Sequence, residues 1–249
     1  MTDATLDEPT RDGLPPMPPG PPHEEKHFAQ NPVLRDLVIG AAEGMVVPFA
    51  LAAALAGAAA ANPLIAKAGL AATAAGGVAL GLGVYLGARN DAGHYAAERA
   101  REEEESRLYP DREKWEVAAI LHRYGVRGEV LRQAVDAIAA DRKKWVDFMM
   151  RFELDLTEPD PHRAAQSAAT VGGAFALGGL LPLLPYMLLG SPSAALLVSC
   201  TLTGAALFGL GWLKARARGL PPLRVALQSL AIGGAAAVLA YLAASLLGP

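Results

Sequence analysis

The sequence is poor in cysteine and has no nucleotide-binding signature. Its 249 residues include one cysteine, Cys200, so an intramolecular disulfide framework and a cysteine-based zinc site are both excluded. No G-x-x-x-x-G-K-S/T motif occurs, which argues against ATP hydrolysis. The net charge of −3 argues against a nucleic-acid partner. No nucleophile–base pair is apparent, so we do not expect an enzyme.

Charge is also missing from most of the chain. Between residues 37 and 88 the charged side chains are Glu43 and Lys67 alone, and residues 164–213 have none. A soluble domain does not leave about 50 residues without charge, because its surface needs polar cover. Residues 89–163 instead hold 17 of the 25 acidic and 14 of the 22 basic residues. The pattern predicts an all-α membrane protein with one charged insert.

Five apolar segments are long enough to cross a bilayer, which takes about 20 residues in a helix. They cover residues 37–61, 65–88, 164–189, 194–213 and 225–247. The residues before them are rich in proline and too polar to bury a core. The predicted parts are a disordered tail (1–32), transmembrane helices 1 and 2 (33–88), a helical insert (89–163) and transmembrane helices 3–5 (164–249).

The short loops differ in basic charge. The expected loop at 214–224 carries four basic residues, whereas the loops at 62–64 and 190–193 carry none. Basic loops remain in the cytoplasm, so the N-terminus and the insert are predicted to be cytoplasmic. No targeting segment is visible, and the alanine-rich composition favours a bacterial cell membrane, with a vacuolar membrane as the alternative.

The insert has the signals of four helices, at residues 93–109, 111–124, 128–140 and 142–154. Asp111 and Asp141 are suited to cap two of them, and Gly125 to end one. Four residues of the last helix recur at i, i+3, i+4 and i+7, which predicts one apolar stripe. They are Trp145, Phe148, Met149 and Phe152.

Acidic side chains in the insert lie at helical spacing. The pairs, three or four residues apart, are Glu102 with Glu105, Glu113 with Glu116, and Met149 with Glu153. If the helices form a bundle, these groups converge into a site for Mn²⁺ or Fe²⁺, since a thioether disfavours Ca²⁺ and Mg²⁺. The alternative is a solvated charged helix, with Met149 and the adjacent Met150 as core residues.

Glu43 is an ionisable residue inside the first span. Such a group is costly in a membrane and usually faces a cavity or a partner. Pro48 cannot donate to the carbonyl of Gly44, so a free oxygen lies next to Glu43 and together they suit a cation or a proton. Glycines four residues apart allow close helix packing. They are Gly40/Gly44 in the first span and Gly77/Gly81 and Gly83/Gly87 in the second.

One further pattern, H-E-x-x-H, occurs at His23–His27. In a zinc protease this motif lies on a helix. Here it follows the proline-rich tail and has charged residues between its ends, without an apolar helix around it. Loose metal contact is the most that it predicts.

Several stretches together resemble the vacuolar iron transporter family of metal/proton antiporters. The most specific is Trp145-Val-Asp-Phe-Met-Met-Arg-Phe-Glu-Leu154. Others are Arg35–Gly40, Val47–Ala53, Gly81–Leu86, Glu158–Pro161, Pro182–Tyr186 and Ala226–Gly234. The resemblance runs from about Arg35 to the C-terminus, and the layout of five spans with a helical insert is the family's own.

The resemblance implies a homodimer with the first spans at its interface. It also implies that the insert binds divalent metal and that metal then moves along spans one and two against protons. The matching insert positions are Glu102, Glu105, Glu113, Glu116, Met149 and Glu153, with Met150 adjacent. In the first span the family usually has aspartate where this chain has Glu43.

Two positions depart from the family pattern. Ala72 stands where the family tends to have glutamate, and Leu80 where it tends to have methionine. The leading hypothesis is export of Fe²⁺ and/or Mn²⁺ from the cytosol, driven by protons, by a dimer in contact with membrane lipid and without a permanent cofactor. The alternative is a membrane-tethered metal-binding or sensing module that does not transport.

Overall fold

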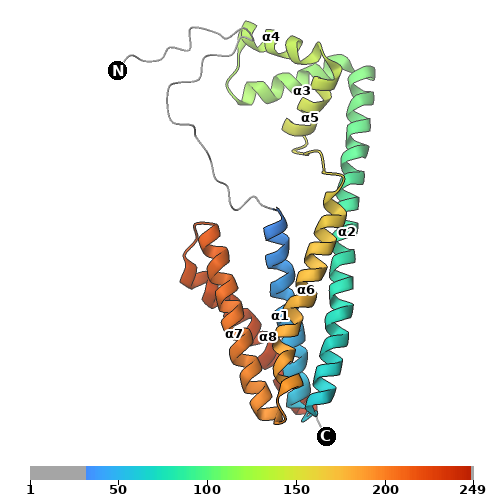
Figure 1. Ribbon diagram of the computed structural model, residues 1–249. Coiled ribbons are helices and arrows are strands. Elements are labelled where there is room, and N and C mark those ends of the chain that lie inside the picture. Colours follow the sequence, from blue (N-terminus) through green and yellow to red (C-terminus); the bar gives the residue numbers. More distant parts are fainter. Residues whose placement is uncertain (1–31, 248–249) are drawn as a thin grey trace, which may run out of the picture.

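A computed structural model describes residues 32–247, which form eight α-helices and no strand (Figure 1). The predicted all-α class is confirmed for this part of the chain. The helices are α1 (Pro32–Gly57), α2 (Asn62–Leu108), α3 (Pro110–Arg123), α4 (Gly128–Ala139), α5 (Arg142–Phe152), α6 (Arg163–Leu188), α7 (Pro192–Ala217) and α8 (Pro222–Leu247). The predicted disordered tail, with His23 and His27, lies outside the described residues.

Five helices are long and apolar enough to cross a membrane, as the sequence predicts: α1, α2, α6, α7 and α8. Two expected boundaries are wrong. Asn62 begins α2 instead of forming the turn before it, because Pro63 is tolerated in the first turn of a helix, where its missing N–H needs no partner. Helix α7 continues through Lys214 to Ala217, so much of the expected basic loop is helical.

Helix α2 joins the apolar helices to the charged insert without a break. Its 47 residues extend about 70 Å at the usual rise per residue. The first half packs among the membrane helices, and the second half projects beyond them along one side of the molecule (Figure 1). The insert, made of the end of α2 with α3, α4 and α5, is therefore continuous at its start with a membrane helix, and residues 153–162 connect it to α6.

Helix α6 packs closely against α1 and α2, and glycine makes this approach possible. A Cβ atom at Gly44 would lie 2.1 Å from the backbone oxygen of Phe175 in α6, and one at Gly40 would lie 2.2 Å from that of Val171. Gly77 and Gly81 likewise face α6. The predicted close packing is confirmed at these two glycine pairs. It is wrong for Gly83 and Gly87, whose Cβ positions meet nothing within 4 Å among the described residues.

Within the insert, one residue separates α2 from α3. Pro110 disfavours helical backbone at Tyr109, which adopts φ −132° and ψ 52° and ends α2. Pro110 then occupies the first turn of α3, with Tyr109 as the N-cap. Asp111 is therefore not the cap that the sequence suggests, because the proline starts the helix before it. Gly125 ends α3 with φ +94°, as predicted.

Helices α3, α4 and α5 share a small apolar core of Val117, Val135, Trp145 and Met149. The predicted cap of α5 is confirmed, since a carboxylate oxygen of Asp141 accepts hydrogen bonds from the backbone N–H groups of Lys143 and Lys144. The predicted apolar stripe is wrong at Phe152, which is 52% exposed. Val146 and Met150 are buried in its place, because α5 also packs against α2.

Candidate metal site

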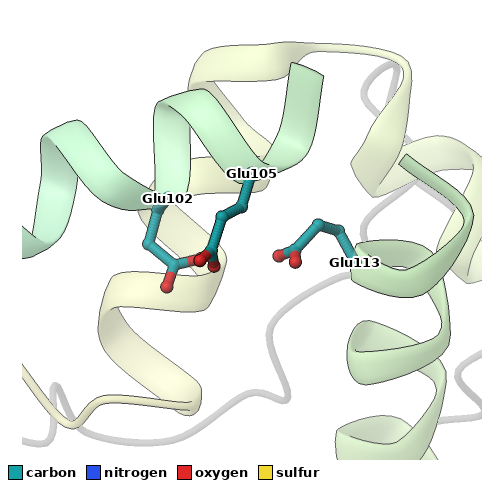
Figure 2. A group of neighbouring side chains, drawn as sticks. All are labelled: Glu102, Glu105 and Glu113. Atoms are coloured by element: carbon teal, nitrogen blue, oxygen red, sulfur yellow. The ribbon is translucent and has the colours of Figure 1, made fainter. Parts of the chain in front are cut away.

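Three glutamates meet where α2 turns back into α3. Glu102 and Glu105 lie on one face of the last turns of α2, and Glu113 lies in the first turn of α3. The single-residue turn at Tyr109 brings these two helix ends together, so that the three carboxylates point toward one another (Figure 2). The sequence analysis expected such a convergence if the helices formed a bundle, and the structure brings these three carboxylates together. Their role as metal ligands remains a prediction.

The carboxylates are close enough to share one ion. One oxygen from each of Glu102, Glu105 and Glu113 lies within 4.8 Å of the others. Glu102 is 5% exposed and Glu113 is 2% exposed, whereas Glu105 is half-buried. Buried carboxylates are rare without a partner, because removing their charge from water is costly. Glu102 and Glu113 are therefore not part of a solvated charged helix face, which was the alternative.

The electrostatics of the cluster favour a cation. Burial, and after it the charges of the other glutamates, raise the pKa of Glu102 from 4.5 to about 7. The pKa of Glu113 is also about 7, for the same reasons, and the opposing effect of Arg112 is the smallest of those acting on it. Among residues 32–247, one buried carboxylate oxygen of Glu102 and one of Glu113 lack any hydrogen-bond partner. A bound divalent cation would compensate both the repulsion and the unsatisfied oxygens.

Glu116 and Glu153 lie at the edge of this cluster. Burial and the charges of Glu116 and Glu105 raise the pKa of Glu153, which follows the last residue of α5. Glu116 forms an ion pair of 3.4 Å with Arg112. All five predicted glutamates of the insert therefore act on one another electrostatically, with the two buried ones at the centre.

The two predicted methionines are buried in α5. Met149 and Met150 are each 1% exposed. Met149 packs among the apolar residues of the insert core, and its carbonyl accepts the hydrogen bond of the Glu153 N–H. The thioether thus lies one helical turn before Glu153, in a position that serves the core. A role as a metal ligand remains a prediction.

The oxygen-rich cluster suits a hard or intermediate divalent cation. Carboxylate oxygens bind Mg²⁺, Ca²⁺, Mn²⁺ and Fe²⁺, whereas Cu⁺ and structural zinc favour sulfur and imidazole. No histidine or cysteine is among the residues of the group. The donors therefore fit Mn²⁺ or Fe²⁺ among transition metals.

Glu43 is not part of this cluster. It lies in α1, in the membrane portion, while the other candidates belong to the insert. Its side chain is exposed in the single chain, on the same face as Ile39 and Val47, which are 41% and 49% exposed. The eight candidate residues thus divide into seven in the insert and one in a membrane helix.

One buried acidic residue near the membrane helices escaped the sequence analysis. Asp36, at the start of α1, is 3% exposed, and its carboxylate lies 2.7 Å from a guanidinium nitrogen of Arg163 at the start of α6. Arg35 lies 3.5 Å away on the other side. The adjacent charges of Arg35 and Asp36, just before an apolar span, were the available signal. The arginine that completes the pair lies 127 residues away in the sequence.

Comparisons with known proteins agree with this layout. A family model described as the VIT family matches residues 34–245, which include every membrane helix and the insert. Vacuolar iron transporter 1 of Arabidopsis thaliana is 45% identical over 219 residues, covering 88% of this chain and 88% of the plant protein. Vacuolar iron transporter 2 of Oryza sativa subsp. japonica is 45% identical over 219 residues, covering 88% and 89%. Protein CCC1 of Saccharomyces cerevisiae is 30% identical over 224 residues, covering 87% of this chain and 69% of the yeast protein.

Proposed function

The chain belongs to the VIT family, and from this premise we propose that it exports Fe²⁺, Mn²⁺ or both from the cytosol in exchange for protons. Its plant relatives are transporters by name, not enzymes. The observation that carries the proposal is the group of three converging glutamates in the insert. Two of them are buried, and each has an oxygen without a hydrogen-bond partner among the described residues 32–247.

The insert captures the ion. Glu102, Glu105 and Glu113 supply oxygens at distances that one divalent ion can bridge. The negative charges of Glu116 and Glu153 act on the same site. Met149 and Met150 of α5 supply thioether sulfurs as additional, softer ligands. Because the carboxylates repel one another when empty, binding a cation relieves strain that is already present in the folded protein.

Glu43 carries the ion across the membrane. It is the acidic residue in the apolar part of α1, beyond Asp36 at the start of the helix, and a carboxylate can hold either a metal ion or a proton. Exchange of one for the other at a single group is the simplest basis for antiport. The substitution of glutamate for the family's usual aspartate keeps the charge.

The exposed face of α1 supports a homodimer. Ile39, Glu43 and Val47 form one stripe, and exposure of a charged carboxylate to lipid is costly. A second copy packed along this stripe would remove Glu43 from lipid and place two such carboxylates near one axis. The remaining exposed apolar surface of α2, α7 and α8 then contacts membrane lipid.

The end of the molecule that carries the insert is assigned to the cytoplasm. Lys214, Arg216, Arg218 and Arg224 lie at or near the ends of α7 and α8, at the same end as the start of α1 (Figure 1). Their positive charge favours the cytoplasmic side. Because the insert captures the ion on this side, the proposed direction of transport is out of the cytosol. We place the protein in a bacterial cell membrane, with the vacuolar membrane as the alternative.

The direct test is metal flux in proteoliposomes with an imposed pH gradient. We expect Fe²⁺ or Mn²⁺ to move in the direction opposite to the protons. Glu43→Gln should abolish this movement, since glutamine can neither release a proton nor carry a charge. Ser229→Ala, which removes an uncharged polar group from the crevice beside Glu43, is the matched control and should transport. Wild-type rates in Glu43→Gln would contradict the role of this residue.

The dimer has its own test. In a Cys200→Ser background the chain has no cysteine, so Val47→Cys reports contact with a second copy alone. We expect an oxidant to produce a covalent dimer from Val47→Cys. Val78→Cys, exposed on α2, serves as the control for random collision. Equal yields from both variants would contradict an interface through α1.

A membrane-tethered metal sensor is the second candidate. It is favoured by α2, which has Ala72 and Leu80 where metal ligands are usual in the family. The buried hydroxyl of Thr73, next to Ala72, donates a hydrogen bond to the backbone oxygen of Gly69 in the same helix. Metal binding by the full-length protein without flux for either ion would select this candidate over transport.

A further inference from the structure

Glu43 lines a small crevice between α1, α7 and α8. The crevice has a volume of about 200 Å³, and Lys214 in the last turn of α7 lines it from the opposite side. The other polar side chain of its lining is Ser229 in α8. A carboxylate and an ammonium group therefore share one small space at the end of the membrane helices that carries the insert.

The floor of this crevice is tightly packed. A Cβ atom at Gly211 would lie 2.8 Å from Cα of Ala226 and 2.7 Å from Oγ of Ser229, so α7 and α8 touch there. The hydroxyl of Ser229 donates a hydrogen bond to the backbone oxygen of Val225. The polar group that remains opposite Glu43 is thus the Lys214 ammonium, on a long and flexible side chain.

The other charged residues of α1 are already paired. Arg35 and Asp36 lie about two helical turns before Glu43, and Asp36 pairs with Arg35 and with Arg163. Lys67 in α2 lies at the opposite end of the membrane helices, near Asn62. Within residues 32–247, neither Glu43 nor Lys214 takes part in an ion pair or a side-chain hydrogen bond. Lys214 is therefore the cationic side chain of the crevice lining, and no ion pair engages it within this part of the chain.

We propose that Lys214 is the built-in counter-cation of Glu43: it neutralises the carboxylate while no metal is bound, and an incoming divalent ion displaces it. The inference rests on the proposed function and deepens it. An ammonium group beside the carboxylate weakens binding of a second cation, because like charges repel. A divalent ion competes with it better than a monovalent one, and the returning lysine helps to release the metal. Lys214 is thus a positioning residue that sets affinity and turnover together.

The test compares Lys214→Met with Arg216→Met, which removes the same charge two residues along the same helix. Initial rates of Fe²⁺ flux are measured in proteoliposomes over a range of ion concentrations. We expect Lys214→Met to lower KM by about fivefold or more, with a lower kcat, since both substrate binding and release depend on the competing cation. Arg216→Met should change KM less than about twofold, and Lys214→Arg should stay near wild type.

The outcomes separate this inference from the function on which it rests. If the wild-type protein shows no flux, transport itself is wrong, whatever Lys214 does. If wild type transports but Lys214→Met and Arg216→Met have the same KM, the effect is one of general surface charge and the inference is overturned. An unchanged KM in Lys214→Met overturns it as well. Glu43 would then bind its ion without a competing lysine.

Discussion

The two parts of the molecule bury carboxylates in opposite ways. At the membrane helices, Asp36 is buried with the guanidinium of Arg163 at 2.7 Å, so its charge is compensated within the protein. In the insert, Glu102 and Glu113 are equally buried, but their neighbours are other glutamates. The first arrangement joins two helices, and the second leaves negative charge that, in the function we propose, a divalent cation compensates. A buried carboxylate therefore indicates a candidate cation-binding site when its neighbours are also negatively charged.

The largest effect should come from Asp36→Asn. The variant removes the buried charge of Asp36 and leaves the half-buried Arg163 without its partner, and breaking a buried pair costs about 3–5 kcal/mol. We expect a clear drop in the thermal unfolding midpoint of the purified protein. Arg35→Gln removes the more exposed arginine from the same carboxylate and should cost less than about 1 kcal/mol. Equal losses from the two variants would show that Arg163 is not the main partner.

The next effect concerns metal binding by the insert. The double variant Glu102→Gln, Glu113→Gln removes the two buried charges, and we expect Fe²⁺ or Mn²⁺ affinity to fall by about 100-fold or more. Titration calorimetry on the full chain measures it. Glu104→Gln lies in the same run of glutamates but is exposed and pairs with Arg107, so it should bind like wild type. Equal losses would place the site elsewhere.

Binding should also depend on pH near neutrality. The pKa of Glu102 and that of Glu113 are about 7, so below that pH a metal ion must displace protons. We expect affinity to fall by about tenfold for each pH unit between 7 and 5 if one proton is displaced, and more steeply if two are. Above about pH 8 it should become constant. A flat profile from pH 5 to 8 would contradict burial of the empty carboxylates.

The smallest predicted effect is a gain in folding stability, opposite to the loss expected for Asp36→Asn. The pKa of Glu113 is raised from 4.5 to about 7 in the folded state, so the unfolded chain loses its proton first as pH rises. Stability of the metal-free protein therefore falls between about pH 4.5 and 7. Glu113→Gln removes this loss and should stabilise the metal-free protein by about 1 kcal/mol at pH 8. Thermal unfolding with a chelator, at pH 5 and pH 8, measures the difference, and destabilisation at pH 8 would contradict it.

The sequence was informative where local spacing decides the outcome. The apolar lengths predicted five membrane helices, and helical spacing placed Glu102 and Glu105 on one face of a helix. That these carboxylates meet Glu113 followed from the sequence only on the condition that the helices of the insert form a bundle. The start of α3 was misplaced by a residue or two because Asp111 and Pro110 are both good starting residues, and the proline comes first.

Contacts between distant segments could not be read from the sequence. Asp36 meets Arg163 only because α1 and α6 pack with their starts side by side, and no local pattern marks this pair. The glycine pair Gly83/Gly87 has the same spacing as Gly77/Gly81, yet only the latter faces α6. Spacing places residues on one face of a helix, but the neighbours of that face depend on the whole fold.

The central claim is that capture and transport occur at two separate sites. The most direct measurement determines metal binding and metal flux on the same preparations of Glu43→Gln and of the double variant Glu102→Gln, Glu113→Gln. We predict that Glu43→Gln binds metal at the insert with wild-type affinity and transports none. The double variant should lose that binding while it still transports slowly at high ion concentration. Loss of insert binding in Glu43→Gln, or wild-type flux in it, would contradict the account.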